Sequence, residues 1–455
     1  MKSKTLRFYS FENRSDTLLE TKEIFGRSED LSEELGTKGC CYIGKNVSYP
    51  GGKYEETGKA YLDIVSPHCM LVLGKRGTGK SYTLGVIAEG FAKLKQKYSD
   101  NISLILVDTM SVFHSLKKCN SNEKEIKLMD DFDIEPENFS KKLNILIPEI
   151  AIKKANEDSA ELHYDEVLKI PLEKVAVHEW LELFDLDLTS EIGTLLSQII
   201  TGLKERGRFS FDDLYEQIEK TDHGKRETRS KLINLFKTIE KKNLFSEEGT
   251  KTFVRPGDIT VLDISYLGRI GDFDLRRLVV SIFARDQMAK RTLYTTIEMQ
   301  AQADLLEKGN EKSMLDKHPI VYMLIDEAHL FLPKNKKTLS SSPLIDWIKL
   351  GRHPGLSLIM ATQEPSALHP TAIRQSDMII AHNMTSNDDL NALKLAKQSY
   401  MKRGLDEVVA DMEFKRGLAM IFDDRRRELQ LCKIRPRHTL HTGVDASALT
   451  PEEKY

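Results

Sequence analysis

The alternation of apolar and polar residues predicts short buried strands separated by amphipathic helices. "HCMLVLG" (68–74) and "ISLILVD" (102–108) are continuous apolar runs, the pattern of strands buried on both faces of a parallel sheet. Between them Leu84, Ile87 and Phe91 recur at helical spacing. We therefore expect an α/β fold with a mostly parallel, doubly wound sheet.

Similar runs return in the second half of the chain. They read "ITVLDI", "IVYMLID", "LSLIMATQ", "SDMIIAHN", "GLAMIF" and "LQLCKI". The segment between the two groups is charged and amphipathic, with helical patterns in "VHEWLELFDL", "EIGTLLSQIITGLKE" and "SKLINLFKTIEKK". Ser210 and Asp213 there form a start that resembles a capping box, which predicts an inserted helical lobe.

The expected organisation follows from these patterns. Residues 1–66, with the turn-like "SYPGGKYEETG", form a short N-terminal element that contains some β structure. The core is split into 67–119 and 256–443, the helical lobe occupies 120–255, and 444–455 form a C-terminal tail.

Composition narrows the class of protein. With 455 residues, 40% apolar and 30% charged, the chain is globular, and it has neither an apolar run long enough to span a bilayer nor the apolar core of a signal peptide. We therefore expect a cytoplasmic protein that does not bind membranes. Five cysteines without a C-x-x-C pair indicate neither a disulfide framework nor a zinc site. A net charge of −3 requires any contact with a polyanion to be local.

The segment "GKRGTGKS" meets the phosphate-loop pattern G-x-x-x-x-G-K-[ST], between a predicted strand and a predicted helix. In such loops backbone N–H groups cradle phosphates, while Lys80 would reach the β and γ phosphates of ATP and Ser81 would ligate Mg²⁺. A glycine-rich turn that binds nothing is the alternative, but the flanking elements favour nucleotide binding. The candidate residues are Gly74, Lys75, Arg76, Gly77, Thr78, Gly79, Lys80 and Ser81.

An acidic pair, Asp326 and Glu327, ends the run "IVYMLID". A parallel strand delivers such residues to the carboxyl edge of the sheet, where the glycine loop also lies. We expect Asp326 to hold Mg²⁺ and Glu327 to act as the general base toward the attacking water. The alternative is a pair of carboxylates that caps the start of a helix at "EAHLFL".

Two further polar residues are candidates for catalysis. Gln363 ends "LSLIMATQ" and should project from the same edge, although a polar strand end is the simpler interpretation. Arg352 follows a predicted helix on a turn with Gly351 and Pro354. It is either a solvated helix end or an arginine finger that serves the ATP of a neighbouring subunit.

Other nucleotide-dependent classes fit less well. The tetrapeptide "DEAH" at 326–329 invites assignment to the DEAH-box helicases, but the Ser-Ala-Thr motif of those enzymes is missing from the sequence. The Asn-Lys-x-Asp signature for guanine is missing too, so ATP is the preferred nucleotide. A metabolic kinase would need a small-substrate pocket that the sequence does not indicate.

Together these segments resemble the HerA–FtsK family of DNA-pumping ATPases, and most closely its HerA-like branch. The matching pieces are "MLVLGKRGTGKSYTLGVIAEG", "LILVDTMSVFHSLKK", "DITVLDISYL", "VYMLIDEAHLFLP", "KLGRHPGLSLIMATQEPSALHP" and "IRPRHTLHTG", in family order. The resemblance implies a RecA-like core and a homohexameric ring around duplex DNA, with ATP sites at subunit interfaces. It implies Gln363 as the sensor glutamine, Arg352 as the finger and a NurA-like nuclease as partner. HerA proteins carry an N-terminal β-barrel, and we expect residues 1–66 to be a reduced version.

The favoured function is thus an ATP-hydrolysing motor that translocates along or remodels double-stranded DNA. The alternative is a nucleotide-gated scaffold that acts with a partner such as a nuclease and has little motor activity. Lys334, Lys336 and Lys337, in a loop that follows the acidic pair, are the candidate DNA contacts, against the simpler interpretation of a solvated loop. The next candidates are Arg425, Arg426 and Arg427.

Overall fold

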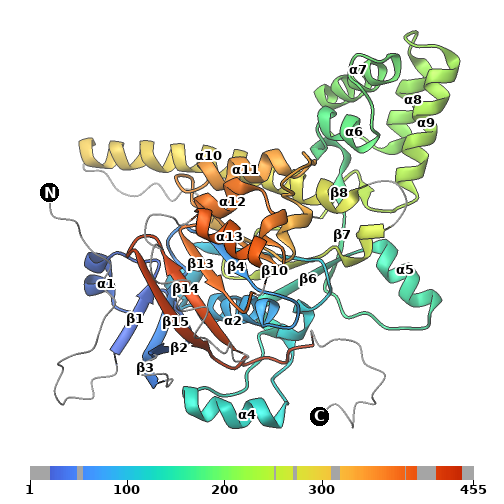
Figure 1. Cartoon of the computed structure of the whole chain (residues 1–455). Helices are drawn as coiled ribbons and strands as arrows, with labels where there is room; N and C mark the ends of the chain where they lie inside the picture. Colours follow the sequence, from blue (N-terminus) through green and yellow to red (C-terminus); the bar gives the residue numbers. More distant parts are fainter. Residues whose placement is uncertain are drawn as a thin grey trace.

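The computed structural model describes residues 21–48, 55–250, 253–269, 274–308, 318–384, 386–396 and 417–442. Within these residues the chain builds one large central sheet flanked by helices on both faces (Figure 1). In order from one edge to the other, its strands are β1 (Thr21–Phe25), β3 (Glu55–Asp63), β2 (Cys40–Ser48), β15 (Glu428–Ile434), β14 (Leu418–Asp423), β13 (Met378–Ala381), β4 (Cys69–Leu73), β12 (Leu356–Thr362), β11 (Ile320–Ile325), β5 (Ile102–Asp108), β10 (Ile259–Asp263), β6 (Leu143–Pro148) and β7 (Glu166–Leu168).

The sheet has a parallel part and an antiparallel part. From β13 to β7 every neighbouring pair runs parallel, and β5 is buried along its whole length, which explains its continuous apolar sequence. From β13 through β14, β15, β2 and β3 the pairs are antiparallel, and β1 pairs parallel to β3. The predicted α/β class with a mostly parallel sheet is confirmed.

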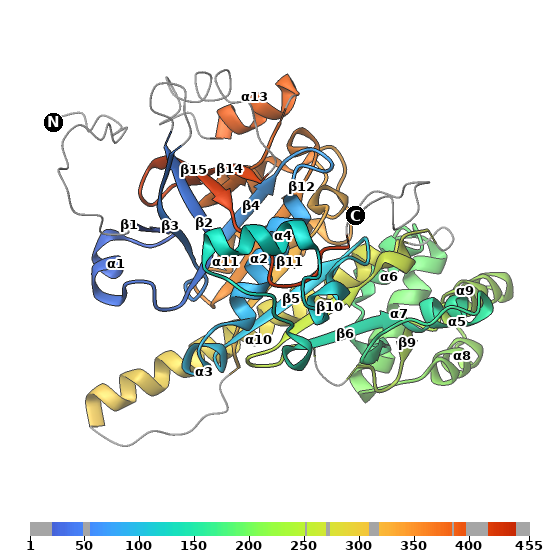
Figure 2. The same ribbon diagram turned by 90° about the horizontal axis from the view of Figure 1, so that it is seen from below.

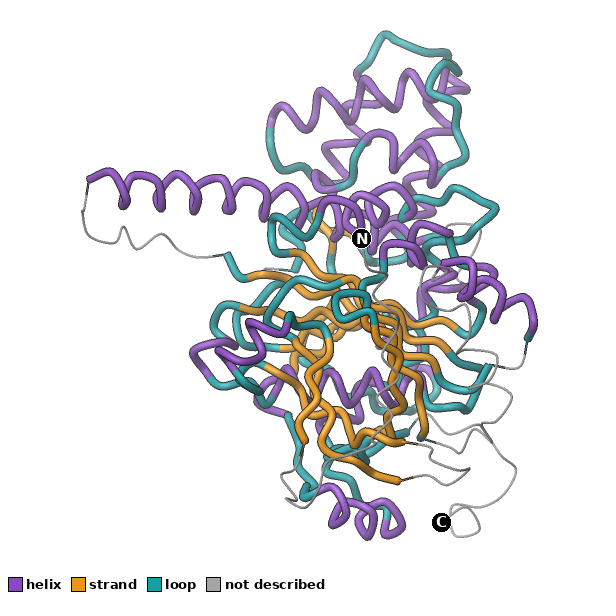
Figure 3. The backbone as a smooth tube through the Cα atoms, turned by 60° about the vertical axis from the view of Figure 1, so that its left-hand side comes forward, coloured by secondary structure: helices purple, strands orange, loops and turns teal. Residues whose placement is uncertain are grey.

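One face of the sheet is covered by α2 (Lys80–Ala92). Leu84 and Ile87 of this helix share a buried apolar cluster with Val72 of β4. Because α2 contacts β4 and also β2 of the antiparallel part, the sheet curves around the helix, as Figure 3 shows. The helix that begins at the glycine loop is therefore held on several sides.

The opposite face is covered by α10 (Leu275–Lys308), α11 (Ser341–Leu350) and α12 (Pro370–Gln375). Leu278 and Trp347, from the first two of these helices, belong to a second apolar cluster with Val107 of β5. Figures 1 and 2 show that the far part of α10 projects from the body of the molecule. Helices α1 (Glu29–Leu35), α3 (Gln96–Ser99), α4 (Glu123–Met129), α5 (Glu149–Glu157) and α13 (Asn387–Ala396) are also described.

A group of helices stands apart from the sheet (Figure 1). It contains α6 (Val177–Leu183), α7 (Glu191–Arg206), α8 (Phe211–Lys220) and α9 (Arg226–Glu240). Trp180 is fully buried at its centre, 5.1 Å from Phe236 between ring centroids. The capping box that the sequence predicts at Ser210 and Asp213 is present at the start of α8.

The expected ranges and the observed elements differ in detail. Residues 120–255, expected as a helical lobe, also supply β6 and β7 to the central sheet, so the separate helices begin only at α6. The two-residue strands β8 (Ile170–Pro171) and β9 (Phe245–Ser246) pair with each other in a separate small sheet. The N-terminal element extends the same sheet, because β2 pairs with β15. "SYPGGKYEETG", expected as a turn or loop, is wrong at both ends, since Ser48 ends β2 and residues 55–58 begin β3. Residues 49–54 lie outside the described residues. The expected tail, 444–455, lies outside the described residues.

Candidate functional site

The glycine loop joins the carboxyl end of β4 to α2, as the motif requires. Gly79 caps the helix at a φ of 118°, and Gly77 has a φ of 76°, both in the left-handed region that favours glycine. At Gly74 a side chain is excluded by space as well, because a Cβ there would lie 2.7 Å from the Cβ of His382. The sequence pattern and the backbone geometry therefore agree at this loop.

Within the loop, Lys80 is the principal charged group. Lys80 is 6% exposed, and its Nζ donates to the carbonyl oxygen of Lys75 at 3.1 Å. The same carbonyl accepts the Thr78 hydroxyl at 2.7 Å. Burial lowers the pKa of Lys80, while the Glu327 and Asp326 carboxylates act in the opposite direction. An ammonium group shielded from water in this way interacts strongly with an anion such as a phosphate.

The segment that follows β13 also holds the loop and the start of α2. The Lys75 amide donates to the Asn383 carbonyl at 3.1 Å, and the His382 ring lies 2.9 Å from the Thr83 hydroxyl through Nε2. Burial lowers the pKa of His382 to about 4, so the ring is neutral. His382 was not among the residues predicted from the sequence, although its place at the end of the run "SDMIIAHN" was a usable signal.

Asp326 lies directly beside the start of α2. The Ser81 hydroxyl donates to Asp326 Oδ2 at 3.1 Å, and Asp326 is 2% exposed. Burial, followed by the charge of Glu327, raises the pKa of Asp326 to about 6. A hydroxyl and a carboxylate at this separation, next to a phosphate loop, form a donor set that suits Mg²⁺, so Ser81 and Asp326 are the residues that would hold it.

Glu327 is held in an unusual conformation next to this pair. Its φ of 52° is uncommon for a residue other than glycine and indicates local strain. The Gln363 amide donates to Glu327 Oε1 at 3.0 Å, whereas Oε2 is buried and takes no hydrogen bond from the described residues. Burial raises the pKa of Glu327. One carboxylate oxygen is thus fixed, and the other can accept a proton from a water molecule.

The order of strands explains why these residues meet. β12 lies between β4 and β11, so the carboxyl ends of all three strands bring the glycine loop, Gln363 and the acidic pair to one edge. The same edge continues to Asp108 and Asp263, which are register partners at the ends of β5 and β10. Burial and the nearby Asp263 raise the pKa of Asp108 to about 7. The sequence pattern indicates Asp108 only as the end of a strand, without a function.

Arg352 is not part of this cluster within one chain. It is exposed and lies on the turn between α11 and β12, at the amino end of the strand whose other end leads to Gln363. Strand geometry of about 3.3 Å per residue separates the two by roughly 20 Å. Leu350 beside it is 62% exposed. Arg352 can therefore reach a nucleotide only if that nucleotide belongs to another subunit.

The loop that contains the three candidate lysines is exposed and connected to the catalytic edge. Lys334, Lys336 and Lys337 are all exposed. They line a hollow of about 370 Å³ together with residues that include Ser341, Ser342 and His369. The Lys334 amide donates to the Ala367 carbonyl at 2.8 Å, in the segment that directly follows Gln363. This lysine loop is thus attached to both strands that carry the candidate catalytic residues.

The strand order, the loop and the acidic edge together define the architecture of a P-loop NTPase. Comparison with known proteins identifies the family: a profile described as "Helicase HerA, central domain" matches residues 43–286, and one described as "Helicase HerA-like C-terminal" matches residues 246–418. Since the first match spans more than half of the chain, this protein belongs to the HerA family.

Individual relatives are distant. The chain is 20% identical over 373 residues to the DNA double-strand break repair helicase HerA of Pyrococcus furiosus, a match that covers 76% of this chain and 61% of that protein. It is 28% identical over 92 residues to the probable DNA double-strand break repair helicase HerA of Methanocaldococcus jannaschii, covering 20% of this chain and 17% of that protein. The chain therefore spans about three fifths of the first relative's length.

A solved structure supports the fold. VirB4 of Thermoanaerobacter pseudethanolicus superposes with a TM-score of 0.50 at 15% sequence identity, over 92% of this chain and 99% of that chain. At this identity the similarity concerns the fold alone. Among the described residues, every helix is too short or too polar to cross a bilayer.

Proposed function

We propose that this protein is an ATP-hydrolysing motor that acts on double-stranded DNA as a homohexamer. The observation that carries the proposal is the pair of contacts at the catalytic edge, Ser81 to Asp326 at 3.1 Å and Gln363 to Glu327 at 3.0 Å. They bring together a phosphate loop, a cation-binding pair and a general base, which is the full set of groups that hydrolysis of a nucleoside triphosphate needs.

Each residue has a distinct part in this proposal. Backbone N–H groups of residues 74–79 and the Lys80 ammonium bind the phosphates, and burial of Lys80 strengthens that attraction. Bound by Ser81 and Asp326, Mg²⁺ would neutralise charge on the β and γ phosphates. Glu327 Oε2 accepts the proton of the attacking water, while Gln363 holds the other oxygen of that carboxylate in place.

The position of Arg352 supports the proposed subunit arrangement. This residue is exposed at the edge of the sheet opposite to the glycine loop, so within one chain it cannot contact a nucleotide bound there. In a ring, one subunit can present that turn to the ATP of the next, and Arg352 then stabilises the charge that develops on the transferred phosphate.

The DNA part of the proposal rests on the family and on the lysine loop. The relatives from Pyrococcus furiosus and Methanocaldococcus jannaschii are named as DNA double-strand break repair helicases. Three exposed lysines in one loop supply local attraction for phosphates without a basic overall charge. A NurA-like nuclease as partner is a further expectation from the family resemblance. A cytoplasmic location remains the expectation drawn from the composition of the sequence.

A DNA-stimulated phosphate-release assay tests the proposal. We expect duplex DNA to raise the steady-state rate of ATP hydrolysis by the purified chain, and we expect Lys80→Ala to abolish both the basal and the stimulated rates. A chain that binds ATP and turns it over slowly, with no response to duplex DNA, would instead support the nucleotide-gated scaffold.

A further inference from the structure

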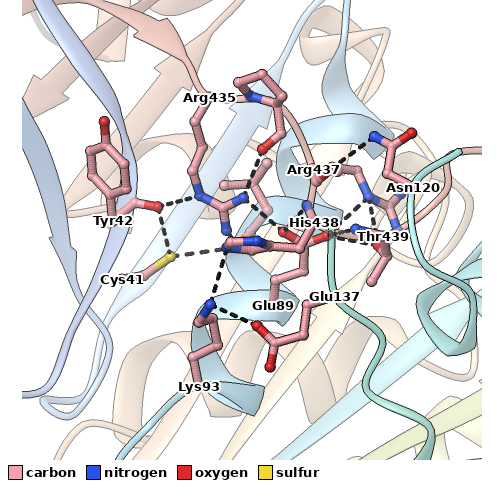
Figure 4. Close-up of polar contacts among 12 residues, drawn as sticks. Cys41, Tyr42, Glu89, Lys93, Asn120, Glu137, Arg435, Arg437, His438 and Thr439 are labelled. Atoms are coloured by element: carbon pink, nitrogen blue, oxygen red, sulfur yellow. Dashed lines mark hydrogen bonds and ion pairs between the residues drawn. The ribbon is translucent and has the colours of Figure 1, made fainter. Parts of the chain in front are cut away.

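The segment that follows β15 crosses α2 and is fixed to it by buried charges (Figure 4). We refer to residues 435–442 as the C-terminal strap. Arg435 donates to Glu89 Oε2 at 2.8 Å, and the Thr439 hydroxyl donates to Glu89 Oε1 at 2.7 Å. The Glu89 side chain is completely buried, so these contacts compensate for a charge that would otherwise be costly to bury. Burial alone would raise the pKa of Glu89, but Arg435 and Arg437 lower it.

The strap is also fixed on its other side, to the segment after β5. Asn120 donates from Nδ2 to the Arg437 carbonyl at 2.9 Å, and the Leu440 amide donates to the Lys118 carbonyl at 2.9 Å. On α2 itself, Gly85 makes room for the strap, because a Cβ at this position would lie 2.6 Å from the guanidinium carbon of Arg437. The strap is therefore held against α2 by contacts on both of its sides.

This arrangement brings an aromatic ring to the first turn of α2. The rings of Tyr82 and His441 meet edge to face, with centroids 5.2 Å apart and planes at 77°. The Tyr82 hydroxyl accepts the Arg437 amide at 2.8 Å and donates to Glu125 at 3.0 Å. Both aromatic residues are only partly buried. Tyr82 directly follows Ser81, so the pair lies at the nucleotide end of the helix.

The direction in which a nucleotide lies in a phosphate loop determines which of its groups is next to Tyr82. Lys80 and Ser81 serve the β and γ phosphates and the cation between them, and the first helical turn also faces the α phosphate. The ribose and the base are attached to the α phosphate and must leave the loop from that turn. Aromatic side chains provide stacking surfaces for bases of any sequence, because every base has a π face.

We propose that Tyr82 and His441 form a platform for the base of the nucleotide bound at the glycine loop, with the strap holding His441 in place through Glu89. The ligand class is a nucleoside triphosphate or diphosphate. The platform rests on the proposed function, because it requires nucleotide binding at Lys80 and Ser81. The platform gives the end of the described chain a role in binding the base, which neither the glycine loop nor the acidic pair can perform.

The test compares ligands with and without a base. ATP, ADP and inorganic tripolyphosphate are titrated into the full-length chain and into His441→Ala, Tyr82→Leu and Tyr82→Phe. We expect His441→Ala and Tyr82→Leu to weaken ATP and ADP binding about tenfold, which corresponds to the loss of one stacked base, and to leave the affinity for tripolyphosphate unchanged. Tyr82→Phe is the matched comparison: it loses the two hydroxyl hydrogen bonds but keeps the ring, and it should therefore bind ATP more tightly than Tyr82→Leu.

The outcomes separate the platform from the phosphate site. Parental ATP affinity in His441→Ala and in a folded Tyr82→Leu would overturn the platform, as would equal losses for ATP and tripolyphosphate, which would indicate a disturbed loop. Should Tyr82→Leu fail to fold, His441→Ala decides alone, because His441 is partly exposed near the end of the described chain. A parent chain that binds neither ATP nor tripolyphosphate would contradict the proposed function, and the platform with it.

Discussion

The amide of Gln363 donates to one oxygen of the Glu327 carboxylate across 3.0 Å and thereby joins the carboxyl ends of β12 and β11. The second oxygen of Glu327 is buried without a hydrogen bond from the described residues. His329 approaches this oxygen to 3.4 Å through Nδ1, but burial lowers the pKa of His329, which disfavours the charged form of the ring. Glu327 is therefore oriented by one neighbour and remains able to accept a proton.

The first prediction concerns this pair. Glu327→Gln should bind ATP with parental affinity and lose turnover by a factor on the order of 10² to 10⁴, because only the proton acceptor is removed. Gln363→Ala should lose less turnover than Glu327→Gln, by a factor of about ten or more, because the general base remains but is no longer oriented by the amide. Nucleotide titration and steady-state phosphate release measure both effects. Parental turnover by Glu327→Gln would remove this residue from the mechanism.

The second prediction concerns Arg352, which must complete a site on another subunit if it is catalytic. Arg352→Ala should lower turnover on the order of 10³ with little loss of ATP binding. Mixing Arg352→Ala chains with Lys80→Ala chains should restore part of the activity, because some interfaces then pair an intact loop with an intact arginine. Mixed assemblies as inactive as either parent variant would argue against action between subunits.

The third prediction concerns the lysine loop. Replacement of Lys334, Lys336 and Lys337 by alanine should weaken duplex binding equally for all sequences and flatten its dependence on salt, because fewer counterions are released. Basal ATP hydrolysis without DNA should persist. The triple lysine-to-arginine variant is the matched control and should retain the salt slope. If the alanine variant keeps parental affinity and slope, the main DNA contact lies elsewhere.

Of the three arginines that are the next candidate DNA contacts, Arg427 is exposed, whereas Arg425 and Arg426 are less suited to this role. Arg425 lies 3.6 Å from Asp377, and Arg426 forms an ion pair with Glu23. Both arginines therefore help to attach the turn between β14 and β15 to the rest of the sheet. Their charges are partly neutralised within the chain, whereas the three lysines are exposed.

Much of the catalytic edge could be predicted from the sequence because its signals are local. A continuous apolar run that ends in a polar residue indicates a parallel strand and the edge at which it ends, which predicts the positions of Asp326, Glu327 and Gln363. The glycine motif predicts the position of Lys80. The hydrogen bonds of Ser81 to Asp326 and of Gln363 to Glu327 then follow from the strand order.

Contacts between distant segments could not be predicted in the same way. Nothing near Glu89 in the sequence indicates that its charge is compensated by Arg435 and Arg437, because these residues meet only after β15 pairs with β2. The same holds for β6, which lies within a helix-rich stretch and nevertheless joins the central sheet. Local periodicity determines the element, and long-range packing determines its neighbours.

The fourth prediction concerns pH and the buried cluster that attaches the N-terminal element. His68 Nδ1 lies 2.9 Å from Asp377, and its Nε2 lies 3.9 Å from Asp63, which also pairs with Arg27. Burial alone would lower the pKa of His68, but the Asp377 and Asp63 carboxylates raise it, with Arg425 acting against them. The folded state therefore binds this proton more tightly than the unfolded chain does.

Protonated His68 then contributes fully to stability below the ordinary pKa of histidine. This contribution is lost as the pH rises through the higher pKa that His68 has in the folded state. Urea unfolding from about pH 6 to about pH 9 should show a decrease in the free energy of unfolding that is smaller in His68→Gln. His163→Gln, at an exposed histidine, should follow the parent. If the free energy of unfolding depends on pH identically in His68→Gln and in the parent, the raised pKa of His68 would be contradicted.

The central claim is that ATP hydrolysis at this edge drives movement along duplex DNA. The most direct measurement is displacement of a labelled third strand from a triplex placed on linear duplex, with Glu327→Gln as the control that binds ATP without turnover. The account predicts displacement by the parent chain that requires ATP and is lost in Glu327→Gln. ATP hydrolysis by the parent with no displacement, on duplex that it is shown to bind, would contradict the motor and leave the nucleotide-gated scaffold.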